Sequence, residues 1–469
     1  MAELTFLGAA GEVTGSRYRI DFHDDDRSRT LLLECGMHQG GPEADAANAR
    51  ESQPPPSQID AVVISHGHLD HAGLLPRLVR EGYAGPIHCT GDTLELLEIM
   101  LVDAAVVMER DMERENRWRR RAHKPLRTPL YEQEDVARTL ELCVAHDYDR
   151  CTRLPGGVEL VFRDAGHILG SAIVELTVPS GGRRRRLVFS GDLGNADSVL
   201  MREPARIRDA DVVLMESTYG DRDHRPMADT LEEFSRVLEE ANEAGGNVLI
   251  PAFAVGRTQE ILYHLGRLHH EGRLRQQRIF LDSPMAIRVT ELYARSWRAL
   301  DRDDVQALHC AAGGDPARYL PGLRATRTVE ESMAINRIRG GAIIIAGAGM
   351  CTGGRILHHF RYNLARSSCR VIIVGFQATG TPGRMLVDGA ENLRILGEEI
   401  PVRARVHTIG GFSAHAGRTH LVLWAGAFRD KPRFWLVHGE PGAQQALSVA
   451  MKDAGMDASV AVHGDVIPL

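Results

Sequence analysis

The stretch Ser65-His66-Gly67-His68-Leu69-Asp70-His71 places three histidines and one aspartate within six residues. The residues just before it, 59–64 (Ile-Asp-Ala-Val-Val-Ile), form a short apolar run that predicts a buried strand. A buried strand that ends in a tight loop of imidazoles and a carboxylate holds a metal ion rigidly. Nitrogen with carboxylate is a zinc-type ligand set, and a purely structural zinc is disfavoured because such sites favour cysteine and no cysteine is near.

The spacing inside this stretch predicts two metal ions. His66 and His68 alternate along an extended backbone, so both side chains face the same ion. Asp70 and His71 turn away from that ion and face a second one. A polar surface loop without metal is the alternative, but His-x-His-x-Asp-His is a much more specific pattern than a single histidine after a strand.

The composition is that of an ordinary soluble globular protein, with 43% hydrophobic and 25% charged residues. A length of 469 residues predicts two or three domains. The net charge of -7 provides no global basic field of the kind that marks nucleic-acid binding. Nucleic acid is not excluded, because a metal site and a local arginine cluster bind phosphates even on an acidic protein.

The cysteines and the N-terminus predict a cytoplasmic protein. The seven cysteines are scattered and never form Cys-x-x-Cys, which favours a reducing compartment over a disulfide framework. Residues 1–4 lack the basic and apolar regions of a signal peptide, and no apolar run is long enough to span a membrane.

Reactive side chains recur at the ends of apolar runs. Asp192 follows 187–189, Glu216 follows 212–215, and His438 follows 435–437. Strands buried on both faces read as such continuous runs, and their ends deliver polar side chains to one rim of a sheet. Ligands far apart in sequence therefore converge.

The segment 221–408 has a different pattern. Apolar strand-like runs such as 248–250, 278–281, 342–346 and 371–374 alternate with helical periods. This alternation predicts a parallel sheet with helices on its faces, and so a second α/β domain.

Two arginine-rich runs need an explanation. A helix expected from about 92 to 121 ends in Asn116-Arg117-Trp118-Arg119-Arg120-Arg121, a basic cluster with one aromatic residue. A solvated helix face is favoured over an RNA contact there. The run 183–186 is interpreted as a solubilising strand edge.

Several motifs resemble those of one known family. His66-x-His68-x-Asp70-His71, with Asp60 upstream, resembles the signature of the metallo-β-lactamase fold. Three further motifs resemble the markers of the β-CASP nucleases; they are Glu216-Ser217-Thr218-Tyr219-Gly220, Phe412-Ser413-Ala414-His415 and Leu436-Val437-His438-Gly439-Glu440. The likeness covers essentially the whole chain. One departure is Glu34, in Glu34-Cys35-Gly36, where relatives usually carry aspartate.

The resemblance implies an α/β fold with two parts. Residues 1–220 and 409–469 would form the metallo-β-lactamase αββα sandwich, and residues 221–408 an inserted β-CASP α/β domain with a helix-flanked parallel sheet. The third marker motif carries histidine, His438, and in this it resembles the RNA-processing branch of the family. That branch includes the nuclease subunit that cuts pre-messenger RNA before polyadenylation and its bacterial homologues.

The resemblance also implies seven ligands for two zinc ions. One ion would be held by His66, His68 and His167, the other by Asp70, His71 and His438, with Asp192 as the bridge. Two metals roughly 3.5–4 Å apart share a water and lower its pKa toward about 7. His415 is the expected proton donor to the leaving oxygen, and Glu216 is expected to keep it protonated.

Other residues receive supporting roles. Asp60 comes too early on its strand to bind metal, and we expect it to orient an imidazole N–H. Ser413 and the glycine-rich turn 347–354, which includes Gly349, are candidate hydrogen-bond donors to phosphate. For the glycines, a tight turn that binds no ligand is an equal alternative. Arg257 is expected to bind phosphate or to pair with an acid.

The leading hypothesis is a zinc-dependent ribonuclease. Its expected substrate is single-stranded RNA, and the expected mode of cleavage is endonucleolytic. A 5′-exoribonuclease and a hydrolase of small esters or thioesters are the alternatives, and the second is disfavoured because small substrates need no inserted domain. An RNA-binding scaffold without catalysis is disfavoured by the complete ligand set. The sequence does not decide whether the protein forms a homodimer.

Overall fold

The computed structural model describes residues 1–24, 27–296, 316–378 and 380–469. The chain divides into two compact units. Unit 1 comprises residues 1–196, 203–223 and 415–469, and unit 2 comprises residues 197–202 and 224–414.

Unit 1 contains two mixed β-sheets of seven strands each among the described residues. The first has the order β22 (Val466–Pro468), β1 (Glu3–Gly8), β2 (Arg17–His23), β3 (Ser28–Leu33), β4 (Ala61–Val63), β5 (Ile87–Thr90) and β6 (Cys143–His146). The second has the order β21 (Ala458–Val460), β20 (Arg433–Val437), β11 (Val212–Glu216), β10 (Arg183–Phe189), β9 (Ala172–Ser180), β8 (Glu159–Asp164) and β7 (Thr152–Arg153).

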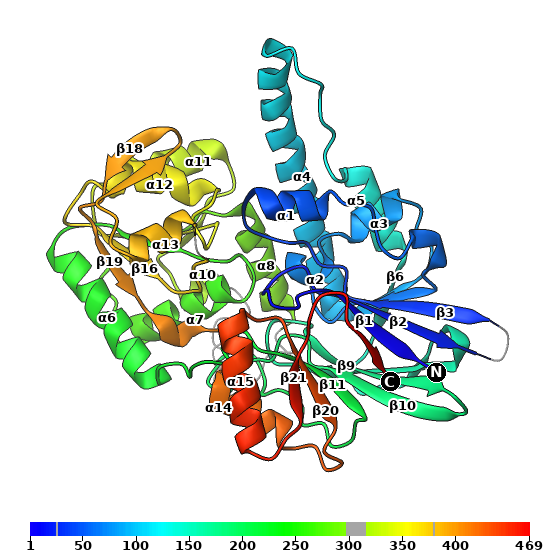
Figure 1. Ribbon diagram of the computed structural model, residues 1–469. Coiled ribbons are helices and arrows are strands. Elements are labelled where there is room, and N and C mark those ends of the chain that lie inside the picture. The colour runs from blue at the N-terminus through cyan, green and yellow to red at the C-terminus, as the bar shows by residue number, and fades with distance from the viewer. Residues whose placement is uncertain (25–26, 297–315, 379) are drawn as a thin grey trace. The chain divides into compact units, whose positions relative to one another are not determined.

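The helical segments of unit 1 complete its layers (Figure 1). They are α1 (Gly41–Asn48), η1 (Pro56–Gln58), α2 (Leu69–Ala72), α3 (Leu75–Arg80), α4 (Gly91–Arg121), α5 (Gln133–Glu141), η2 (Pro155–Gly157), α14 (Arg418–Ala425) and α15 (Pro441–Asp453). Helices α3, α4 and α5 cover the first sheet, and α14 and α15 cover the second.

Three apolar cores follow from the strand patterns of unit 1. Alternate side chains of β1 and β2, such as Phe6 and Ile20, meet those of β9 and β10, such as Leu176 and Phe189, between the two sheets. The opposite faces of β3, β4 and β5 in the first sheet, and of β9, β10, β11 and β20 in the second, pack against helices. Because helices cover the outer faces of these strands, the layers run helix, sheet, sheet, helix, and the predicted αββα sandwich is confirmed.

Unit 2 is built on a six-stranded sheet in which every described pairing is parallel. Its order is β14 (Leu323–Ala325), β13 (Arg278–Leu281), β15 (Ala342–Ala346), β12 (Val248–Pro251), β16 (Arg370–Ile373) and β19 (Arg405–Thr408), with a separate ribbon of β17 (Asn392–Ile395) and β18 (Glu398–Pro401). Its helical segments are α6 (Met227–Glu243), α7 (Arg257–His270), α8 (Pro284–Arg295), α10 (Pro316–Tyr319), α11 (Val329–Ile335), α12 (Arg355–Asn363), α13 (Pro382–Val387) and η4 (Gly410–Phe412).

Helices cover both faces of the parallel sheet in unit 2. Side chains of α6, α7 and α8 pack on one face, around Ile250 and Ile343. Side chains of α12 and α13 pack on the other, around Leu249 and Val371. The continuous apolar strands that predicted a parallel α/β sheet are therefore buried on both sides, as that architecture requires.

Candidate metal centre

The predicted ligands of unit 1 all lie at strand ends. His66, His68, Asp70 and His71 follow β4 and enter the short helix α2. His167 precedes β9, and the remaining ligands follow strands of the second sheet; they are Asp192 after β10 and His438 after β20. Strands of both sheets therefore deliver polar groups to one place, as the pattern of apolar runs predicts.

These side chains form two groups of potential ligand atoms. In the first, one atom each of His66, His68, His167 and Asp192 lies within 4.8 Å of the others. In the second, the same holds for Asp70, His71 and His438. Ring nitrogens face one another closely, with Nε2 of His66 at 3.1 Å from Nδ1 of His68 and Nε2 of His71 at 3.2 Å from Nε2 of His438.

Asp192 lies between the two groups and turns one oxygen toward each. Its Oδ2 is 3.5 Å from Nε2 of both His66 and His167. Its Oδ1 is 3.3 Å from Nε2 of His71 and 3.6 Å from Nδ1 of His438. A carboxylate with this disposition has the geometry of a bridging ligand.

The chemistry of the cluster fits zinc. Oδ1 of Asp192 is buried and accepts no hydrogen bond from the described residues, which is costly unless a cation satisfies it. Burial, together with the neighbouring His71, lowers the pKa of His66 well below its usual value. A neutral imidazole is the form that binds metal, so this shift favours the metal-binding form of His66.

Glu34 is a functional residue that the sequence analysis missed. Its Oε2 lies 2.6 Å from Nδ1 of His71, and Ser65 donates its backbone N–H to Oε1 at 2.6 Å. A carboxylate here orients the ring so that Nε2 of His71 faces the ligand group. The available signal was an acidic residue directly after the apolar strand β3, which pairs in parallel with β4.

Asp60 does not orient a histidine, so that prediction is wrong. It binds Arg27 at 2.8 Å and Arg29 at 3.0 Å, and it accepts the backbone N–H of Thr30 at 2.9 Å. The physical reason is position, because Asp60 precedes β4 and so lies at the opposite end of that strand from the histidines.

Thr218 is a second missed residue. Its Oγ1 lies 3.1 Å from Nδ1 of His438 and 3.2 Å from the carbonyl oxygen of the same residue. His438 adopts a left-handed backbone conformation with φ of 50°, and the threonine contacts fix its ring there. Thr218 belongs to the motif that begins at Glu216, where only the carboxylate had been assigned a role.

His415 and Glu216 form a pair beside Asp192. Nδ1 of His415 lies 3.2 Å from Oε1 of Glu216 and 4.0 Å from Oδ2 of Asp192. Burial alone would lower the pKa of His415, but the Glu216 carboxylate, with Asp192 and Asp70, raises it to about 9. Glu216 itself is fully buried and accepts the backbone N–H of Leu193 at 2.7 Å.

The loop after Asp192 holds His415 in register. His415 forms an antiparallel bridge with Gly194, and the backbone N–H of Ala416 donates to the carbonyl of Leu193 at 2.8 Å. Gly194 has no room for a side chain, since a Cβ there would lie 1.9 Å from the carbonyl oxygen of Gly166. The loops of Asp192, His167 and His415 are thus tied together through backbone contacts.

The three candidate phosphate contacts belong to unit 2. Arg257 is buried and pairs with Glu260 at 2.7 Å, so the acid-pairing alternative describes it. Gly349 lies in the turn that follows β15, where an added Cβ would meet the ring of Phe253 at 2.7 Å. Ser413 is buried directly after η4.

Three family models cover most of the chain. The metallo-β-lactamase superfamily matches residues 18–240, the β-CASP domain matches 258–386, and a Zn-dependent metallo-hydrolase RNA specificity domain matches 399–461. Ribonuclease TTHA0252 of Thermus thermophilus is 42% identical over 466 residues, which cover 99% of both proteins. The chain belongs to the metallo-β-lactamase/β-CASP ribonuclease family. This β-CASP enzyme is a metal-dependent, RNA-specific hydrolase, which confirms the predicted family, fold and enzyme class.

Less similar proteins also align over most of this chain. The transcription termination factor FttA of Cenarchaeum symbiosum is 30% identical to the β-CASP enzyme, over 96% of this chain and 68% of that protein. The FttA protein of Methanosarcina mazei is 29% identical, over 94% and 67% respectively. A crystal structure of a protein of unknown function from Enterococcus faecalis is 11% identical, covers 100% of both chains and has a TM-score of 0.55, which shows the fold alone.

None of the helices in the described part of the β-CASP enzyme has the length and apolar character needed to cross a membrane.

Proposed function

We propose that the chain is an endoribonuclease that hydrolyses single-stranded RNA at a centre of two zinc ions. The observation that carries the proposal is the position of Asp192, whose two oxygens face two separate groups of imidazoles. The proposed ligands are His66, His68 and His167 for one ion, Asp70, His71 and His438 for the other, and Asp192 for both.

When bound, zinc ions at such a centre supply a water acidic enough to attack at neutral pH and neutralise charge on the phosphoryl oxygens. The protein contributes a fixed, dry setting for that chemistry. Glu34 and Thr218 hold the rings of His71 and His438 through their Nδ1 atoms. Because these contacts exist before substrate arrives, little reorganisation is needed during the reaction.

His415 is proposed to supply the proton that the leaving group needs. Attack of water on phosphorus forms one P–O bond and breaks the bond to a sugar oxygen, which departs as an alkoxide. Glu216 holds Nδ1 of His415 at 3.2 Å, which favours the imidazolium form and fixes the ring. Transfer of that proton to the sugar oxygen leaves a neutral alcohol and a phosphomonoester.

RNA is favoured over small esters as substrate by the RNA specificity domain that the region 399–461 matches. The relative Ribonuclease TTHA0252 supports nuclease activity most directly, because it aligns over 99% of its own length, whereas the FttA relatives align over about two thirds of theirs.

The free state of the six described cysteines supports a reducing, cytoplasmic setting.

The deciding experiment uses one RNA labelled either at its 5′ end or internally. A ladder of internal cuts, present from the earliest times, is the expected result. Mononucleotides released from the 5′ end would establish the 5′-exoribonuclease alternative instead. Asp192→Asn serves as the control, because contaminating nuclease would survive that substitution. Faster turnover of a β-lactam or thioester than of RNA would contradict the proposal.

The zinc count is tested separately. Elemental analysis of protein purified without added metal should find two zinc equivalents per chain. One equivalent in a fully active enzyme would contradict the dinuclear centre but leave the ribonuclease activity standing.

A further inference from the structure

Helix α4 and the segment after it form an arm that no part of the proposed mechanism uses. The arm comprises residues 106–130, and Figure 1 shows the helix extending past the body of unit 1 with only its return segment beside it. The buried residues of α4 end at Ala105, and no residue of the arm is buried. Burial of apolar surface therefore does not account for the arm.

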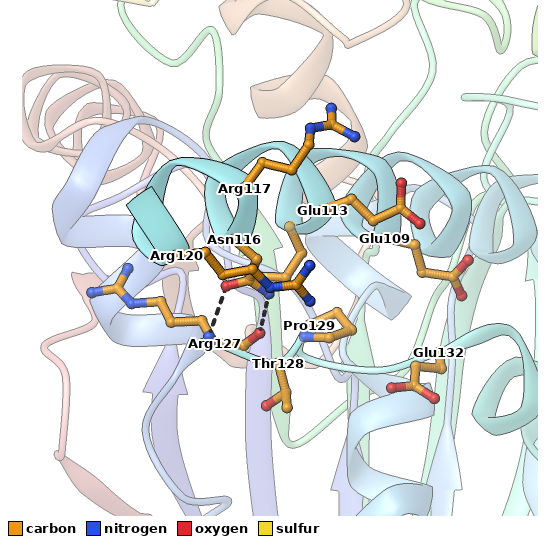
Figure 2. Close-up of a pocket in the computed structure, with 10 residues that line it drawn as sticks. Glu109, Glu113, Asn116, Arg117, Arg120, Arg127, Thr128, Pro129 and Glu132 are labelled. Atoms are coloured by element: carbon orange, nitrogen blue, oxygen red, sulfur yellow. Dashed lines mark hydrogen bonds between the residues drawn. The ribbon is translucent and has the colours of Figure 1, made fainter. Parts of the chain in front are cut away.

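Polar contacts build the arm into a defined element. The Asn116 side chain donates to the carbonyl of Arg127 at 2.8 Å and accepts the backbone N–H of Arg127 at 3.0 Å (Figure 2). Arg119 donates to the carbonyl of Pro125 at 2.9 Å. These bonds pin the return segment to the helix, so the arm presents its tip in a fixed shape.

The tip is strongly basic although the chain as a whole is acidic. Residues 114–127 contain seven arginines and lysines against one glutamate, Glu115. That glutamate lies 2.7 Å from Arg119 and 3.4 Å from Arg127. Within the part of the chain that the structure describes, four cations of the tip have no carboxylate within ion-pair distance; they are Arg117, Arg120, Arg121 and Lys124.

The second arginine-rich run differs in this respect. On strand β10, Arg184 lies 3.3 Å from Glu159, Arg185 lies 2.7 Å from Asp211, and Arg186 lies 3.9 Å from Asp209. That run is largely neutralised by its own neighbours. An uncompensated cluster is the one that attracts a polyanion.

An aromatic side chain and a hollow accompany the charge. Trp118 is 54% exposed, with the Lys124 ammonium 4.7 Å from its ring centre. A hollow of about 590 Å³ lies between the helix and the return segment. Figure 2 shows arginines toward one end of it and Glu109, Glu113 and Glu132 toward the other. The carboxylates repel phosphate, so a bound strand would cross the arginine end.

The other end of α4 adjoins the metal centre. Thr93, in the first turn, donates its hydroxyl to the carbonyl of Gly170 at 2.8 Å, three residues after His167. A Cβ on Gly67 would lie 3.1 Å from Cβ of Leu96. At about 1.5 Å per residue, the helix carries its tip roughly 40 Å from that turn.

We propose that the tip of the arm binds the substrate's own single strand, away from the bond that is cut. Arg117, Arg120 and Arg121 would contact phosphates and Trp118 would stack on a base. A stacked strand rising about 3.4 Å per nucleotide needs roughly 12 nucleotides to cover the length of the helix. The inference rests on the proposed ribonuclease function, and it adds a length requirement to the substrate.

The test compares the triple variant Arg117→Gln/Arg120→Gln/Arg121→Gln with a control of equal charge change, Arg183→Gln/Arg184→Gln/Arg186→Gln. Binding to single-stranded RNA of about 25 nucleotides should weaken roughly tenfold or more in the arm variant only, with a salt slope shallower by about 2 because three phosphate contacts are lost. Trp118→Ala should weaken it by roughly tenfold, at an unchanged salt slope.

Cleavage of short RNA separates this proposal from the ribonuclease function itself. With an RNA of about six nucleotides, too short to reach the tip, kcat/KM of the arm variant should equal that of the wild type. Equal losses on short and long RNA, equal losses in the control variant, or unchanged binding of long RNA would each overturn the proposal. A wild-type enzyme that binds long RNA through the arm but cuts no RNA would refute the proposed function alone.

Discussion

Nδ1 of His71 lies 2.6 Å from Oε2 of Glu34, and both side chains are completely buried. The same carboxylate receives the backbone N–H of Ser65, the residue that opens the histidine motif. One acidic side chain directly after β3 thus contacts both the start of the motif that follows β4 and its last histidine. Glu34 itself has a left-handed backbone conformation with φ of 65°.

Glu34→Gln should loosen the metal centre. An amide does not offer the negative charge that favours an N–H at Nδ1 of His71, so the ring loses its fixed tautomer. Zinc affinity and activity should each fall roughly 10- to 100-fold. Elemental analysis after mild chelation, alongside RNA cleavage rates, measures both.

Asp60→Asn is the matched control for Glu34→Gln, because Asp60 binds arginines on the far end of the neighbouring strand. It should leave zinc content unchanged. Zinc loss in Asp60→Asn, with retention in Glu34→Gln, would reverse the assignment of the orienting carboxylate.

His438→Ala and His415→Ala should separate metal binding from proton transfer. His438→Ala should lower zinc content together with rate, since its ring nitrogen lies 3.2 Å from that of His71. His415→Ala should keep both zinc ions and slow RNA cleavage by roughly 10²–10⁴-fold, the range for losing a general acid. Zinc loss in His415→Ala would show that the ligand assignment is wrong.

A substrate that needs no proton provides an independent check on His415. A nitrophenyl phosphodiester has a leaving oxygen that departs as a stable anion. Where the enzyme turns this compound over, His415→Ala should reduce its rate much less than it reduces RNA cleavage. Equal losses on both substrates would indicate that His415 positions phosphate instead.

Asp282→Asn should destabilise unit 2. The buried Asp282 accepts bonds from Thr326 and Ser332 at 2.6 Å each, lies 2.6 Å from Nε2 of His359, and pairs with Arg355 at 2.7 Å. Loss of this charge should cost about 3 kcal/mol of unfolding free energy at neutral pH. Urea unfolding measures it, and Asp388→Asn, which breaks an exposed pair with Arg384, should cost less than about 0.5 kcal/mol.

The effect of Asp282→Asn should also depend on pH. Burial would raise the pKa of Asp282, but its bonds to His359, Ser332, Thr326 and Arg355 hold it well below the usual range. A depressed pKa contributes stability above the unfolded value of about 4 and loses it gradually at lower pH. The difference between wild type and variant should therefore be constant from pH 5 to 7 and shrink below about pH 4. A difference that grew on acidification would contradict this.

The metal cluster was predictable because its signal is local and its architecture is simple. His66 to His71 lie within one short stretch, and the ends of buried strands meet at a common rim. The carboxylate that orients a histidine ring was predicted to be Asp60 and is Glu34. Both acids flank strands in the same region, so the sequence pattern does not distinguish them. Only the parallel register of Leu33 with Val63 shows that Glu34 lies at the histidine end of β4. The sequence by itself contains no such register.

The role of Arg257 and the shape of the arm were open for similar reasons. Arg257 and Glu260 are three residues apart on α7, which allows an ion pair, but whether the arginine also meets phosphate depends on burial. Helix α4 was expected at nearly its observed length. The sequence pattern of its exposed, basic second half is the same whether that half lies along the protein surface or extends away from it. Tertiary placement decides between those cases.

The last proposed zinc ligand enters the centre from very far along the chain. His438 contacts His71 across 367 positions, and unit 2 is encoded entirely between them. During synthesis, a ribosome makes the first six ligands and then the whole insertion before it makes His415 and His438. A nascent chain that stops anywhere within the insertion holds an incomplete centre. The proposed centre is therefore complete only after the whole insertion has been synthesised.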